Sequence, residues 1–125
     1  RDIMFTVNGK ELEYDIFDLE KAELFDREMN TVVEKMNALS AEKEQLSFSE
    51  SVRRQCEAVA ECFDHLFGPE TAARIFDGKV NLVLALTSFG ELVDGINAQK
   101  SQIERMANST AAKYTKNRAA RRNKR

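Results

Sequence analysis

The sequence predicts a mainly α-helical fold, with an N-terminal β-hairpin packed on a small helical bundle and a long C-terminal helix or basic tail. Apolar residues recur at three- and four-residue steps along most of the chain, as in amphipathic helices. Only 5 Gly and 1 Pro occur in 125 residues, too few turn residues for a many-stranded β fold. We expect a hairpin over residues 1–17, a helical domain over 18–106 and a basic tail over 107–125.

The hairpin is predicted from a two-residue turn at Asn8-Gly9, between strands at 3–7 and 10–14. Asn-Gly is the favoured pair for a type I′ turn, because both turn positions require positive φ. The alternating apolar residues of the two strands are Ile3, Phe5, Val7, Leu12 and Tyr14. An isolated hairpin is marginal in water, so this face must pack on a helix or on another chain.

A long amphipathic helix should follow, capped by Asp15 or Asp18 and reaching about Leu46. Its apolar stripe comprises Leu19, Ala22, Phe25, Met29, Val32, Met36 and Leu39. The remaining positions are mostly charged, which indicates a helix buried along one side only.

Ser47 and Glu50 fit a capping box and mark the start of a second helix, which Gly68-Pro69 should end. Its apolar face comprises Val52, Cys56, Val59, Phe63 and Leu66. A short helix over about 70–76 is expected next, ending at Asp77-Gly78.

The last helix should begin near Asn81. Its apolar positions are Leu82, Ala85, Leu86, Phe89, Leu92, Val93, Ile96, Ile103 and Met106. Gly90 and Gly95 lie inside this pattern, and each costs about 1 kcal/mol relative to Ala, which suggests a kink or a close helix contact. The predicted core comprises Phe5, Leu12, Phe25, Met29, Val59, Phe63, Phe76, Leu86, Phe89 and Leu92.

Charge divides the chain into an acidic body and a basic end. Residues 1–99 hold 10 Lys and Arg against 20 Asp and Glu, a net charge of −10, whereas residues 100–125 hold 9 against 1, a net charge of +8. The basic positions of the tail are Lys113, Lys116, Arg118, Arg121, Arg122, Lys124 and Arg125. Such a tail is an interaction arm by default, and its partner could be an acidic protein surface or nucleic acid. It could also be a solubilising segment that binds weakly, and we expect 113–125 to be dispensable for folding.

No set of residues predicts catalysis, a cofactor or a metal site. Cys56 and Cys62 are expected to be buried, reduced thiols, and His65, the only histidine, cannot complete a ligand set with them. The glycines form turns or helix stops and do not form a phosphate-binding loop. No apolar run is long enough to cross a bilayer, and no secretory leader is evident. We therefore expect a soluble, noncatalytic binding protein.

Two segments in this order, TVNGKELEYD at 6–15 and FDHLFGPETAARIFDG at 63–78, carry a family resemblance. Over about residues 3–106 the chain resembles the small tail proteins of siphophages and prophages of Gram-positive bacteria, a group similar to the tail assembly chaperones. The resemblance implies a noncatalytic protein of the host cytoplasm, absent from the finished tail. It would bind the long, helical tape measure protein, keep it soluble and help to recruit tail tube protein.

Such a chaperone must offer apolar surface of its own. The candidate partner-binding residues are Phe5, Leu12, Tyr14, Ile96, Ile103 and Met106. Several copies are expected to bind one tape measure chain, and a homo-oligomer is possible. The alternative is a small bacterial adaptor that binds nucleic acid or an acidic protein through residues 113–125. The neighbouring genes would discriminate between the two hypotheses.

Overall fold

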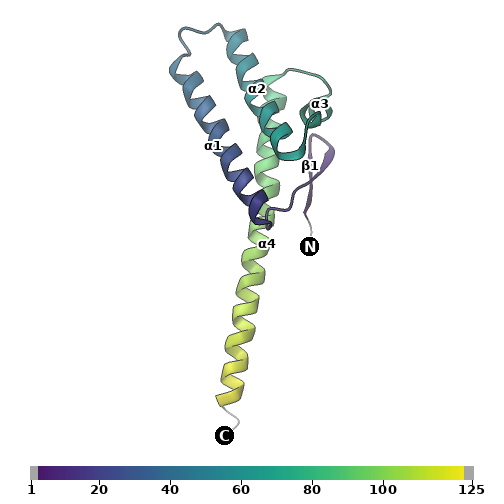
Figure 1. The fold of residues 1–125 in the computed structure, drawn as a ribbon, viewed down its shortest axis with the longest axis vertical. Helices are drawn as coiled ribbons and strands as arrows, with labels where there is room; N and C mark the ends of the chain where they lie inside the picture. The colour runs from purple at the N-terminus through teal and green to yellow at the C-terminus, as the bar shows by residue number, and fades with distance from the viewer. Residues whose placement is uncertain (1–2, 123–125) are drawn as a thin grey trace.

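The computed structural model describes residues 3–122, with side chains to residue 116, and confirms the predicted mainly α-helical fold. The elements are β1 (Met4–Val7), β2 (Lys10–Glu13), α1 (Leu19–Ala41), α2 (Phe48–Phe67), α3 (Thr71–Phe76) and α4 (Leu82–Arg122). Helices α1 and α2 pack side by side, and α4 packs on α2 (Figure 1). The hairpin and α3 lie beside them, while α4 continues alone past the other elements. The predicted long C-terminal helix is therefore present.

The hairpin has the predicted two-residue turn. Asn8 and Gly9 both have positive φ, at 49° and 75°, as a type I′ turn requires. The antiparallel register pairs Phe5 with Leu12, so the apolar side chains of the two strands share one face. That face packs on the chain's own helices, and β1 lies against α4.

The helix ends follow the predicted capping residues. Asp18 accepts a hydrogen bond from the backbone N–H of Lys21, and α2 ends at Gly68, where φ is 109°. Helix α1 ends at Ala41, five residues earlier than predicted. No apolar residue occurs between Ala41 and Leu46 to hold a further turn against α2, and residues 42–45 form turns instead.

The predicted N-cap of α2 is present at Ser47, while the Glu50 carboxylate pairs with Arg54. Ser47 Oγ accepts a hydrogen bond from the N–H of Glu50 over 3.1 Å, which satisfies one free donor of the first turn. The chain then enters α3 through Glu70, which has the left-handed φ of 74°. This tight connection places α3 directly beside the end of α2.

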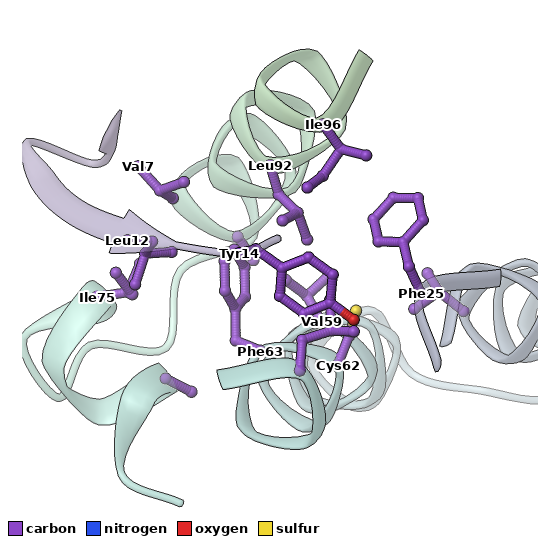
Figure 2. Close-up of a cluster of buried hydrophobic side chains, with 14 of the residues drawn as sticks. Val7, Leu12, Tyr14, Phe25, Val59, Cys62, Phe63, Ile75, Leu92 and Ile96 are labelled. Atoms are coloured by element: carbon purple, nitrogen blue, oxygen red, sulfur yellow. The ribbon is translucent and has the colours of Figure 1, made fainter. Parts of the chain in front are cut away.

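The core lies where the hairpin meets α2 and α4 (Figure 2). Tyr14 is central to it: its ring meets the Phe67 ring edge-on at 5.4 Å, and its hydroxyl donates to the Lys21 carbonyl over 2.6 Å. Six of the predicted core residues are buried, namely Leu12, Phe25, Val59, Phe63, Phe76 and Leu92. Phe5, Met29 and Phe89 are partly buried and pack against them.

The prediction that Leu86 is buried is wrong, because this side chain is exposed. The buried positions of α4 are Ala85, Ser88, Leu92, Ile96 and Gln99. One residue corresponds to about 100° around a helix, so Leu86 points well away from the stripe that begins at Ala85. Leu19 is likewise exposed on α1 although it was assigned to the apolar stripe.

Two polar side chains attach the hairpin to the helices: Asn8, which the sequence identified only as a turn residue, and Gln99, which it did not single out. Asn8 donates through Nδ2 to the Ile75 carbonyl over 2.7 Å, and its backbone N–H donates to Glu91 over 2.9 Å. Gln99, buried on α4, donates through Nε2 to the Ile3 carbonyl over 3.3 Å. The turn and the open end of the hairpin are therefore both attached to helices.

Gly95 explains how closely the hairpin approaches α4. A Cβ at this position would lie 2.6 Å from a ring carbon of Phe5, well inside contact distance. The sequence suggested a kink or a close helix contact at this glycine, but the close neighbour is the β1 strand and not a helix. Nothing lies within 4 Å of the corresponding position at Gly90.

Candidate protein-interaction site

Helix α4 has a packed half and an exposed half. Its last buried residue is Gln99, and every side chain from Ile103 to Lys116 is exposed. The helix continues to Arg122 without a break (Figure 1). We call residues 103–122 the arm. The expected boundary at residue 107 lies within one continuous helix, and the change in burial comes earlier, after Gln99.

The arm carries an apolar stripe of its own. A shallow depression along it is lined by Ile103, Met106, Ala107, Thr110, Ala111 and Tyr114, the set that we call the arm stripe. All of these residues belong to one helix, so the depression is open surface and not a cavity. Ile103 is 38% exposed and Met106 is 54% exposed.

The arm stripe continues the buried face of α4. Ile96 and Gln99 are followed at steps of four, three and four residues by Ile103, Met106 and Thr110. These steps keep all five on one side of a helix. The side of α4 that packs on α2 in the body therefore points outward from the arm.

Basic side chains accompany the stripe. Arg105, Lys113 and Lys116 are exposed on the arm, and Glu104 is the only acidic residue in 100–125. Of the other predicted basic positions, Arg118, Arg121 and Arg122 lie in the helix beyond the described side chains. Lys124 and Arg125 lie outside the described residues.

The structure corrects half of the predicted partner-binding set. Leu12, Tyr14 and Ile96 are almost completely buried in the chain's own core, so they are not available to a partner in this conformation. The hairpin face that needed a partner finds it in α2 and α4 of the same chain. Phe5 is partly buried, and only Ile103 and Met106 of the six candidates are exposed.

Both cysteines are free and buried. Burial, with Glu28 nearby, raises the pKa of the Cys62 thiol to about 12, and burial also raises the pKa of Cys56. Both thiols therefore stay protonated near neutral pH, whereas a nucleophile or a metal ligand must be a thiolate. His65 Nδ1 lies 3.0 Å from Glu28 Oε1 at the surface of the α1–α2 pair. Within residues 3–122, no group of three potential metal-binding side chains comes together.

The hollow between α2 and the start of α4 is small. Its volume is about 130 Å³, and its lining includes Cys56, Phe76 and Ala85. Ligand sites usually enclose about 300 Å³ or more.

In the described part of the chain, no helix combines the length and hydropathy needed to cross a membrane. The arm is therefore the most distinctive candidate site.

A family of unknown function, DUF6673, matches residues 8–125. The chain belongs to this family. The match extends over the whole of α4, so the DUF6673 region includes the arm as well as the packed body. No curated protein and no solved structure matches the chain.

Proposed function

We propose that this DUF6673 protein is a noncatalytic chaperone of phage tail assembly, which binds the helical tape measure protein through its arm. In this proposal it keeps the tape measure protein soluble in the host cytoplasm and helps to recruit tail tube subunits to it. The observation that supports this most directly is the apolar stripe on an exposed helix, beginning at Ile103 and Met106.

A free arm gains little stability from its own chain. Short helices without tertiary contacts are marginal in water, and most helix stability in proteins comes from packing of an apolar face. The arm presents such a face beyond the point where α2 covers it. An amphipathic helix of this kind is suited to pack against a helical partner with a complementary stripe.

The tape measure protein is proposed as the partner because the segments 6–15 and 63–78 resemble those of small phage tail proteins similar to the tail assembly chaperones. A long helical chain with exposed apolar stripes would aggregate before the tail tube encloses it. A protein that binds these stripes reversibly needs an accessible apolar surface of its own, and the arm stripe provides one. The protonated thiols of Cys56 and Cys62 are not suited to act as nucleophiles.

The test is co-expression with a siphophage tape measure protein. The intact chain should raise its soluble yield, and Ile103→Asp together with Met106→Asp should abolish the gain. Val83→Asp is the matched control, because Val83 is an exposed apolar residue of the same helix outside the arm. All variants should show the same helical circular dichroism. Equal solubility of the tape measure protein alone, or equal failure of the control, would refute the proposal.

A second candidate is the adaptor that binds nucleic acid or an acidic protein through its basic end. The observation in its favour is that Lys113 and Lys116 are exposed on a helix. Duplex DNA affinity that falls steeply with salt and is lost in Lys113→Glu with Lys116→Glu would favour this function. The chaperone proposal expects any DNA binding to be independent of Ile103.

A further inference from the structure

Apart from Val83 and Leu86 on α4 itself, the body has two exposed apolar surfaces that could receive the arm of another molecule. The first is on α1, where Leu19 is 72% exposed and Val33 is 57% exposed. Asp26 lies seven residues from each of them, and Glu23 lies beside it, so all four share the outer side of the helix. We call these four residues the α1 face.

The second surface is at the other end of the body, where Phe48 and Val80 are exposed and line one depression. Arg53 contributes to the same depression, and Lys79 is exposed next to Val80. This end patch is therefore apolar with basic neighbours, whereas the α1 face is apolar with acidic ones.

Charge selects between these surfaces. The arm, residues 103–122, holds six Lys and Arg against one Glu, a net charge of +5, so it is attracted to the acidic α1 face and repelled by the cations of the end patch. The same repulsion opposes pairing of two arms with each other. The basic arm and the acidic α1 face belong to one chain whose net charge is only −2. Copies of the chain can therefore associate without a large increase in net charge.

We propose that the arm of one molecule docks on the α1 face of a second copy of this chain. The arm stripe would cover Leu19 and Val33, and the lysines of the arm would lie near Glu23 and Asp26. The lengths agree: 20 residues of arm span about 30 Å, and the 23 residues of α1 span about 35 Å.

This inference goes beyond the proposed function, because it concerns the protein without its client. Self-association would cover the arm stripe until a client competes for it. Both the proposed chaperone function and the proposed self-association require the arm. Only the self-association requires the α1 face. Variants of α1 therefore separate them.

Sedimentation velocity of the full chain tests the self-contact. We expect reversible association at about 50 mM salt that weakens at least about tenfold at about 500 mM. Glu23→Lys with Asp26→Lys should weaken it about tenfold, and Lys113→Glu with Lys116→Glu should do the same. Combining the four changes should restore association, because each charge again meets its opposite. Lys79→Glu is the matched control and should leave association unchanged.

Three results would overturn the inference: a monomer at all concentrations at low salt, no recovery in the combined variant, or loss of association in Val80→Asp with the α1 variants unaffected. Unchanged circular dichroism excludes unfolding as the cause. If the α1 variants still solubilise the tape measure protein, the self-contact and the chaperone activity are separate. If self-association holds while co-expression gives no gain in solubility, only the proposed function fails.

Discussion

The two halves of α4 show how one sequence pattern can serve two purposes. Ile96 and Ile103 lie seven residues apart on the same side of the helix, yet Ile96 is 0% exposed and Ile103 is 38% exposed. The apolar spacing is the same before and after Gln99. The difference is that α2 and the hairpin lie opposite the first half and end before the second. A stripe becomes core or interface according to what faces it.

The strongest way to test this comparison is to place the same charge in both halves. Ile96→Asp buries an unpaired carboxylate and should destabilise the protein by more than about 4 kcal/mol, enough to unfold it. Ile103→Asp should change the free energy of unfolding by less than about 1 kcal/mol, because water reaches the new side chain. Urea denaturation measures both. Equal effects would mean that the arm is also packed.

Within the body, Phe63 is the next most sensitive position. Its ring is completely buried and meets the Phe76 ring edge-on at 5.7 Å. Phe63→Ala should cost about 3–5 kcal/mol through lost burial and the cavity left behind. Thermal denaturation followed by circular dichroism checks this, and an unmoved midpoint would remove Phe63 from the core.

Alkaline pH should weaken the packed body through the buried Cys62 thiol. The pKa of Cys62 is raised from 9.0 to about 12 in the folded state, so its stabilising effect is complete below pH 9 and is lost as pH rises toward 12. At pH 10.5 the loss from this group is about 2 kcal/mol. Denaturation at pH 8 and 10.5 should show a smaller decrease for Cys62→Ala than for the unaltered chain. An identical decrease would contradict the assignment.

The two glycines of α4 provide a matched pair. Gly95→Ala forces the Phe5 ring to move and should destabilise the protein by about 1–3 kcal/mol. Gly90→Ala meets nothing within 4 Å and should stabilise it by about 0.5–1 kcal/mol, because Ala favours the helix. Opposite signs in chemical denaturation are expected, and a stabilising Gly95→Ala would show that the hairpin does not pack as described.

The smallest effect is expected from removing residues 107–125. The last buried residue is Gln99, so the melting temperature should change by less than about 2 °C. Helical content should fall in proportion to the helix removed. Loss of folding would show that the arm belongs to the core and that the comparison between the two halves of α4 is mistaken.

The sequence by itself determined the local features of this protein. The Asn8-Gly9 turn, the caps at Asp18 and Ser47 and the stop at Gly68 all occur as predicted. Each depends on backbone groups within a few residues, so neighbouring sequence is sufficient to predict it. The charge division that produces a basic arm could also be read directly.

Only the tertiary structure decided which apolar residues face the interior. Tyr14 and Ile96 were expected at an interface and are core, and Leu12, which was expected in both the core and the interface, is core. Leu86 was expected in the core and is exposed. Burial depends on segments far apart in the chain, as in the bond from Gln99 to Ile3, which joins residues 96 positions apart. Helical periodicity identifies an apolar face but not the element that covers it, and that is why the arm stripe could be recognised as exposed only in the folded chain.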